Sequence, residues 1–179
     1  MSTFALDPLH SSVEFSVRHL MISKVRGSFN AFSADLELDD VTGLPTAVSA
    51  EVDIASVDTK VADRDAHLRS ADFFDAEKFP KITFRSTSIA GDAGNLAIQG
   101  DLTIHGVTKS VTLATEFDGR ATDPWGNDRV AFSAKAKISR KDFGMTWNQA
   151  LEAGGIAVGD DVDITLTIQA VKAKVAVPA

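Results

Sequence analysis

Strict alternation of apolar and polar residues runs through most of this chain and limits its fold more than any other feature. Val13, Phe15 and Val17, for example, are separated by polar residues. A period of two is typical of a β-strand with one buried and one solvated face. The pattern recurs at residues 35–39, 48–55, 82–85, 96–104, 111–117, 130–138 and 162–170. The sequence therefore predicts about eight strands in an antiparallel sheet with one buried side.

Turn residues separate these runs and bear on how the sheet is arranged. Asp39-Asp40, Thr42-Gly43 and His105-Gly106 are examples, and the last is short enough for a tight hairpin. A one-sided sheet of this size forms either a sandwich or a closed barrel, and closure removes exposed strand edges. We therefore predict an all-β protein, an eight-stranded antiparallel barrel, with residues 1–179 forming a single domain.

Several small residues fall on the inward face of the expected barrel. They are Ala50, Ala134, Ala136 and Ala170. An eight-stranded barrel is either filled by its own side chains or holds one small ligand. The alanines favour a hollow interior.

The segment at residues 59–74 breaks the alternation and contains neither glycine nor proline. We predict a short helix there, with Thr59 as its cap. Asp63 with His67, and Asp65 with Arg69, are spaced to meet on one helix face. The cluster has two interpretations: a carboxylate beside a histidine could act as a general base in a barrel enzyme, or an ion-paired helix could close one end of the barrel. The local pairing favours the helix, so a hydrolase or isomerase that acts on an apolar substrate through Asp65 and His67 is the alternative.

Composition excludes several classes of function. The formal net charge of −7 argues against nucleic acid and anionic membranes as partners, although a small basic patch could be hidden in an acidic total. The chain has no cysteine, which rules out disulfides and thiolate chemistry. The first ten residues do not read as a signal peptide, and no apolar run approaches the roughly 20 residues that span a bilayer. These features predict a cytoplasmic protein without stable membrane insertion.

No catalytic or metal-binding motif appears. The chain has four histidines but no H-x-H or H-E-x-x-H spacing, and His10 and His19 would face opposite sides of one strand. A nucleophile elbow, a P-loop and a dinucleotide fingerprint are also missing. We predict no metal site, no catalytic residue and no catalytic cofactor.

Nine short motifs, in order along the chain, resemble the YceI-like family of polyisoprenoid-binding proteins. They are Asp7-Pro8 with His10-Ser11; residues 15–19, FSVRH; 27–29, GSF; 56–59, SVDT; 64–68, RDAHL; 72–74, DFF; 79–86, FPKITFRS; 100–109, GDLTIHGVTK; and 140–144, RKDFG. The resemblance covers residues 4–171. Phe4 stands where the family often has tryptophan.

The resemblance implies an extended lipocalin-like barrel whose pore holds an isoprenoid lipid, either a polyisoprenoid or an isoprenoid quinone, which the protein sequesters or carries. Many relatives are periplasmic, and a homodimer is left open. The pore-lining residues then expected are Phe15, Val17, Phe29, Val52, Ile54, Leu68, Phe74, Phe84, Leu102, Ile104, Phe132, Ala134, Ala136, Ile138, Trp147, Ile164 and Leu166. Arg18, His19, Arg64 and His67 are candidates for contact with the lipid head group.

Two further sets of residues are open to more than one interpretation. Arg18, Lys24, Arg26 and Lys81 could gather at a barrel mouth, or could be ordinary solvated surface. Trp125 and Trp147 could line or plug the pore, or belong to an ordinary core.

Overall fold

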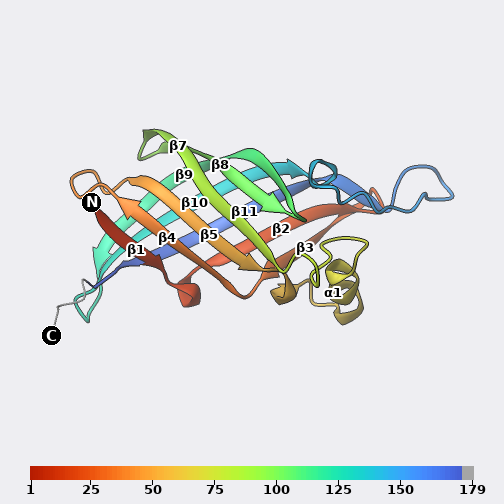
Figure 1. Ribbon diagram of the computed structural model, residues 1–179, viewed down its shortest axis with the longest axis horizontal. Helices are drawn as coiled ribbons and strands as arrows, with labels where there is room; N and C mark the ends of the chain where they lie inside the picture. The colour runs from red at the N-terminus through yellow and green to blue at the C-terminus, as the bar shows by residue number, and fades with distance from the viewer. Residues whose placement is uncertain (175–179) are drawn as a thin grey trace.

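The computed structural model describes residues 1–174 and shows a long antiparallel barrel with one short helix beside it (Figure 1). Eleven strand segments form one sheet. They are β1 (Ser2–Leu6), β2 (Ser12–His19), β3 (Ser23–Phe29), β4 (Phe32–Leu38), β5 (Pro45–Asp53), β6 (Val57–Asp58), β7 (Lys81–Asp92), β8 (Asn95–Ile104), β9 (Val107–Thr122), β10 (Asp128–Ser139) and β11 (Val158–Lys172).

The eleven segments make eight long strands around the barrel, which we call staves, because each of the first three is interrupted once. A 3-10 turn at Pro8–His10 separates β1 from β2, residues 30–31 separate β3 from β4, and a second 3-10 turn at Ile54–Ser56 separates β5 from β6. The sheet order then runs through β7, β8, β9, β10 and β11 in sequence. It closes where β11 pairs with both β1 and β2, placing Phe4 opposite Lys172. The predicted eight-stranded closed barrel is confirmed.

The hairpin between β8 and β9 forms where the sequence predicts it. His105 and Gly106 both have positive φ, 55° and 72°, the conformation that a two-residue type I′ turn requires. Gly106 also lies under the ring of Phe79, where an added Cβ would approach the ring to 2.5 Å. Glycine at this position therefore satisfies both the turn and the packing.

The predicted helix is present but shorter than residues 59–74. Helix α1 covers Ala62–Arg69 and begins after Val61, so Thr59 is not its N-cap. Instead, the Asp65 carboxylate accepts hydrogen bonds from the Thr59 backbone N–H at 2.8 Å and from its hydroxyl at 2.6 Å. The contact thus runs from a side chain within the helix back to Thr59, which precedes the helix by three residues.

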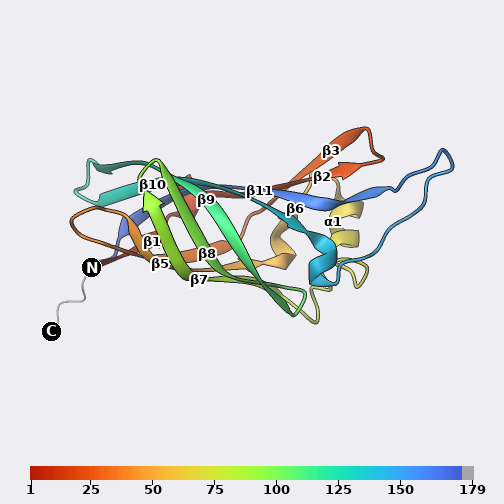
Figure 2. The same ribbon diagram turned by 90° about the horizontal axis from the view of Figure 1, so that it is seen from above.

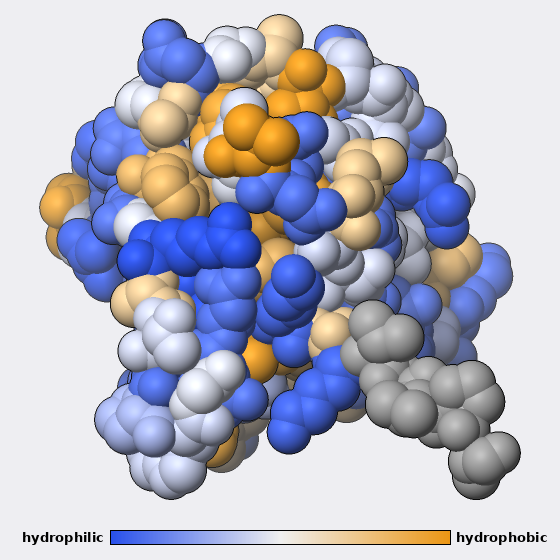
Figure 3. Space-filling model, turned by 90° about the vertical axis from the view of Figure 1, so that its left-hand side faces the viewer, coloured by the Kyte–Doolittle hydropathy of each residue, from blue (hydrophilic) through white to orange (hydrophobic). Residues whose placement is uncertain are grey.

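The two ends of the barrel are packed differently. Near the chain termini, a cluster of buried side chains fills the interior; its members are Phe4, Leu36, Leu38, Leu96, Val130, Phe132 and Ala170. Seen from this end, mostly hydrophilic residues cover the surface, with small apolar patches between them (Figure 3). At the opposite end lie α1, the β2–β3 hairpin and the long connection between β10 and β11 (Figure 2). We call these the filled end and the open end.

Candidate functional site

An inner chamber of about 180 Å³ lies beside the filled end, inside the barrel. Inward residues from all eight staves form its wall, including Ala50 and Ala134. Of its few polar neighbours, Thr115 is buried and donates its hydroxyl to the Leu113 carbonyl at 3.1 Å. Because that hydroxyl is satisfied, the chamber offers an apolar ligand an apolar surface.

A second chamber of about 360 Å³ lies at the open end and is lined by both apolar and charged residues. We call it the mouth chamber. Leu68 comes from α1, Trp147 from the connection after β10, and Arg18 and His19 from β2. Pockets for organic ligands typically occupy roughly 300–1,000 Å³, lined by apolar residues with a few polar groups. The mouth chamber has that size and character.

The two chambers meet at a neck whose residues belong to both walls: Phe15, Phe29, Ile82, Ile104 and Ile164. Phe15 lies across the ladder from Gly27, and its ring occupies the space that a Gly27 side chain would need. A Cβ built on Gly27 would approach the tip of the Phe15 ring to 2.4 Å. Glycine at position 27 therefore sets how far this ring lies from the centre of the neck.

The polar side of the mouth is held by short contacts to α1. Arg64 donates from Nε to the Thr59 hydroxyl and from one terminal nitrogen to the Thr59 carbonyl, both at 2.8 Å. His67 pairs through Nε2 with Asp72 at 2.9 Å. The imidazole also packs edge-on against Phe73 and Trp147, with ring centroids 4.9 and 4.7 Å apart. This aromatic group joins α1 to the connection after β10 across the mouth.

Arg140 lies on the mouth wall and is almost fully buried, with 3% of its surface exposed. Its guanidinium donates to the carbonyls of Gly159, Met145, Trp147 and Val158 at 2.8–3.2 Å. Burial lowers the pKa of Arg140 and the nearby Asp160 raises it, yet an arginine remains charged at neutral pH. The side chain is used to hold the backbone of the connection in place.

Most residues predicted to line the pore lie on these walls. On the inner wall are Val52, Phe84, Leu102, Phe132, Ala134 and Leu166; on the mouth wall are Val17, Leu68, Phe74, Ile138 and Trp147; and Phe15, Phe29, Ile104 and Ile164 form part of the neck. The four candidates for head-group contact, Arg18, His19, Arg64 and His67, all lie on the mouth wall. Their contact with a lipid stays a prediction.

Two predicted lining residues lie on neither wall. Ile54 is 1% exposed and lies in the 3-10 turn that ends β5, where it packs with Val57 behind the neck residue Phe29. Ala136 lies on the same face of β10 as Ala134 and Ile138, but its short side chain borders neither chamber.

Other sequence interpretations are also corrected. Trp125 is 81% exposed in the β9–β10 turn and neither lines nor plugs the pore. The four cations do not form one group on the mouth wall: Lys81 lies on β7 and pairs with Glu51 at 2.8 Å, and of the other three only Arg18 is on the wall.

The pairing expected on the helix face is likewise different. Asp65 bonds to Thr59, and His67 pairs with Asp72 rather than Asp63. Asp65 and His67 therefore engage separate partners and do not form the acid–base pair of the enzyme alternative.

Several wall residues were missed at the sequence level. Val48, Ile82, Ile98 and Leu113 have the alternation that would have identified them. Arg140 has no such signal, because its partners are backbone carbonyls up to 19 residues away.

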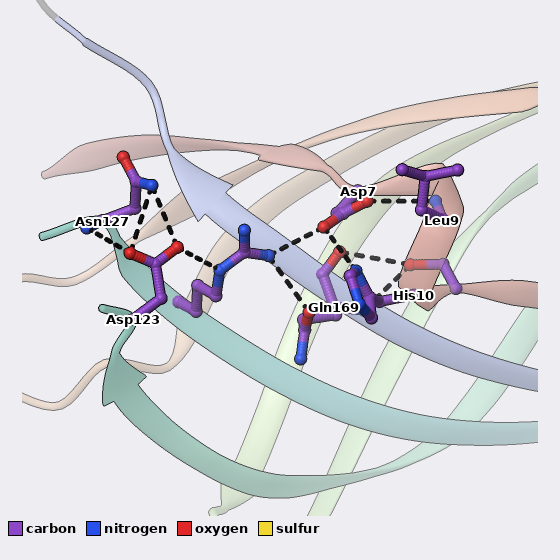
Figure 4. A network of polar contacts seen from close by, with 8 residues as sticks. Asp7, Leu9, His10, Asp123, Asn127 and Gln169 are labelled. Carbon is purple, nitrogen blue, oxygen red and sulfur yellow. Dashed lines mark hydrogen bonds and ion pairs between the residues drawn. The ribbon is translucent and has the colours of Figure 1, made fainter. Parts of the chain in front are cut away.

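A separate polar network lies on the outer side of the filled end (Figure 4). The Arg129 guanidinium bridges Asp7 and Asp123, with both N–O distances 2.7 Å. The hydrogen bond from Arg129 lowers the pKa of Asp7 to about 2 despite partial burial. Burial raises the pKa of Asp123, but hydrogen bonds from Arg129 and Asn127 hold it well below its usual range. The network ties the end of β1 to the β9–β10 turn.

Within residues 1–174, no three histidine, aspartate or glutamate side chains are grouped so as to hold a metal ion. No helix in this part of the chain is long and apolar enough to span a bilayer.

Comparison with known proteins gives consistent matches. The sequence profile of the YceI-like domain matches residues 4–170. A UPF0312 protein of Vibrio campbellii is 40% identical over 165 residues, covering 91% of this chain and 82% of the relative. The crystal structure of the Campylobacter jejuni YceI protein has a TM-score of 0.76 and 32% identity, covering 88% of this chain and 90% of that one. A domain from Saccharophagus degradans, described as polyisoprenoid-binding, has a TM-score of 0.70 at 14% identity and covers 97% and 100% of the two chains.

Proposed function

Because the chain belongs to the YceI-like family, we propose that it binds an isoprenoid lipid in its two joined chambers and carries it without altering it. The observation that carries the proposal is an apolar inner chamber that shares its neck residues with a mouth chamber bordered by Arg18, His19, Arg64 and His67. This arrangement suits a molecule with a long apolar tail and one polar end. The polyisoprenoid-binding domain of the same fold supports this ligand class.

The energetics favour binding of such a molecule. At ~25 cal/mol per Å², burial of several hundred Å² of lipid surface is favourable by on the order of 10 kcal/mol. Ordering a flexible chain offsets a large part of that gain. A rigid barrel with a preformed chamber keeps the remaining cost low.

The proposal also states that the bound lipid is carried and not chemically converted. The residues on the chamber walls include no activated nucleophile, and Asp65 and His67 are engaged with Thr59 and Asp72. The Asp65–Thr59 contact keeps Asp65 away from His67, so the pair expected for an enzyme is not formed, and we favour sequestration or transfer. The polar end of the lipid, whether a quinone ring or a phosphate, would sit among the mouth side chains.

The test is native mass spectrometry of the purified protein, followed by organic extraction and analysis of the released lipid. We expect a bound isoprenoid at up to one per chain, recovered with unchanged mass after incubation. A graded series, Ala134→Val, Ala134→Leu and Ala134→Phe, should reduce occupancy stepwise because the added carbons enter the inner chamber.

Ala114 on the outer face of the adjacent strand provides the matched control, since it is exposed and lies opposite Lys135. Ala114→Phe should keep full occupancy. Equal occupancy across the Ala134 series, or chemical conversion of the extracted lipid, would contradict the proposal.

A further inference from the structure

Three consecutive apolar residues form the exposed tip of the β2–β3 hairpin. Leu20 is 40% exposed, Met21 55% and Ile22 82%. The hairpin extends beyond the body of the barrel at the open end (Figure 2). Exposed aliphatic side chains next to one another at a projecting tip lack the burial that usually explains such residues.

The backbone of this turn does not account for the apolar residues either. Leu20 and Met21 have φ of 52° and 62°, a conformation in which asparagine and glycine are favoured. The turn is held by backbone bonds, with the Leu20 N–H donating to the Ala157 carbonyl and the Ile22 N–H to the His19 carbonyl. Polar or glycine residues would form the same turn with less strain.

The stem below the tip is cationic. Arg18 lies directly opposite Lys24 in the ladder, and Arg26 follows Lys24 on the same face. Like charges directly opposite each other destabilise a strand pair. Lys24 pairs with Asp163 on the neighbouring strand at 3.4 Å, whereas Arg18 and Arg26 form no ion pair with any other described residue. These cations belong to a chain with a net charge of −7.

The tip is also continuous with the mouth chamber. Leu20 and Arg18 both lie on the chamber wall, while Met21 packs beside Gly155 of the connection after β10 and Ile22 is the most exposed of the three. A surface that covered the tip would therefore lie directly beside the opening.

We propose that the β2–β3 hairpin docks reversibly on an anionic lipid bilayer, with Met21 and Ile22 entering the headgroup region and Arg18, Lys24 and Arg26 contacting the anionic lipids. Aliphatic residues flanked by cations are the arrangement of interfacial membrane binding. The acidic remainder of the chain is repelled by the same surface, so the attraction selects one orientation. In that orientation the mouth faces the membrane, and a lipid can pass between bilayer and barrel with little exposure to water.

The test is sedimentation of the protein with two kinds of vesicle, one of phosphatidylcholine alone and one that also contains about one third phosphatidylglycerol. Each surface cation should strengthen binding to the second, anionic kind. We expect binding to the anionic vesicles that weakens as salt increases. The double variant Met21→Asp/Ile22→Asp should bind at least about tenfold more weakly. Aspartate tolerates positive φ, so the turn is preserved. Lys24→Gln/Arg26→Gln should lose roughly fivefold per charge.

Two controls match these variants. Val41 is 94% exposed in the turn after β4 at the filled end, so Val41→Asp removes an equally exposed aliphatic residue elsewhere. Lys135→Gln removes an exposed cation from β10. Both should bind vesicles like the unaltered protein, and the lipid content of every variant is measured in parallel by mass spectrometry.

The outcomes separate docking from lipid binding. Retained internal lipid with lost vesicle binding in the tip variant supports docking, whatever the internal ligand is. Vesicle binding that is equal in the tip variant and the Val41→Asp control overturns it. A dimer that dissociates on Ile22→Asp, without vesicle binding by the unaltered protein, also overturns it and assigns the tip to a second copy of the chain.

Discussion

The filled end and the open end are built on the same eight staves, yet they use their inward residues for different purposes. At the filled end, Phe4, Leu38 and Val130 are each 1% exposed and pack against one another. Beyond that cluster, toward the open end, the inward residues surround first the inner chamber and then the mouth chamber, and the buried Arg140 holds the connection after β10. The difference teaches that one end supplies stability while the other is left to accommodate a ligand.

The largest expected effect tests whether stability resides at the filled end. Phe4→Ala removes a fully buried ring and should lower the free energy of unfolding by about 3–5 kcal/mol, measured by urea denaturation. Phe15→Ala at the neck is the matched variant and should cost only about 1–2 kcal/mol, because part of its ring already faces a void. Equal losses of unfolding free energy in the two variants would contradict the proposed difference in stability between the filled end and the neck.

The next effect concerns the network outside the filled end. Arg129→Met removes the cation between Asp7 and Asp123 and leaves two carboxylates 13% and 7% exposed without their partner. We expect a Tm lower by roughly 5 °C in a thermal scan near neutral pH. Arg120→Met, which breaks a more exposed pair with Asp128, should shift the Tm less.

The same network predicts a dependence on pH. The folded pKa of Asp7 is about 2, below its ordinary 3.8, so its ionised form is favoured by folding. This contribution is present above pH ~4 and is lost as the pH falls through ~2. The Tm difference between the unaltered protein and Arg129→Met should therefore narrow over that interval. A difference independent of pH would assign the effect to packing instead.

A smaller change in stability should accompany a clear change in binding at the neck. Gly27→Ala pushes the Phe15 ring toward the centre, because the added Cβ would lie 2.4 Å from the ring tip. We expect a loss of about 1 kcal/mol in stability but roughly tenfold weaker lipid affinity in a fluorescence titration. In the double variant Gly27→Ala/Phe15→Leu, affinity should recover; no recovery would mean that Phe15 does not control the neck.

The last prediction concerns the mouth, where the main expected effect is on lipid exchange. Trp147→Ala removes the aromatic contacts with His67 and Phe73. Such pairs contribute about 0.5–1.5 kcal/mol each, so the Tm should fall by only a few degrees while bound lipid exchanges several-fold faster. Unaltered exchange would show that the connection after β10 does not close the chamber.

The alternation of the sequence predicted the one-sided sheet because a period of two directly encodes one buried face, and closure into a barrel followed from the need to remove exposed strand edges. The same logic placed Phe84, Phe132 and Ala134 on the inner wall. It failed for Ile54, where the strand gives way to a 3-10 turn and the side chain packs behind Phe29. Periodicity carries no information about such a break.

Polar contacts were harder to predict, since they depend on which segments meet in space. Threonine is a residue type that often caps helices, yet the backbone N–H of Thr59 donates a hydrogen bond to Asp65 within α1. Trp125 is large and apolar, but the β9–β10 turn leaves it in solvent. Arg140 is held by carbonyls of β11 and of the connection before it, a set that no local motif encodes.

The position of β11 has a consequence for how the protein is made. This last stave contributes Ile164, Leu166 and Ile168 to the inner wall and closes the ring against β1, more than 160 residues earlier in the chain. Contacts of such separation form late, because the entropy of loop closure must be overcome before they give any stabilisation. Before β11 pairs, the apolar face of the first seven staves is exposed to water. This exposed apolar surface favours aggregation during folding. The wall of the inner chamber is therefore complete only once β11 has paired with β1 and β2.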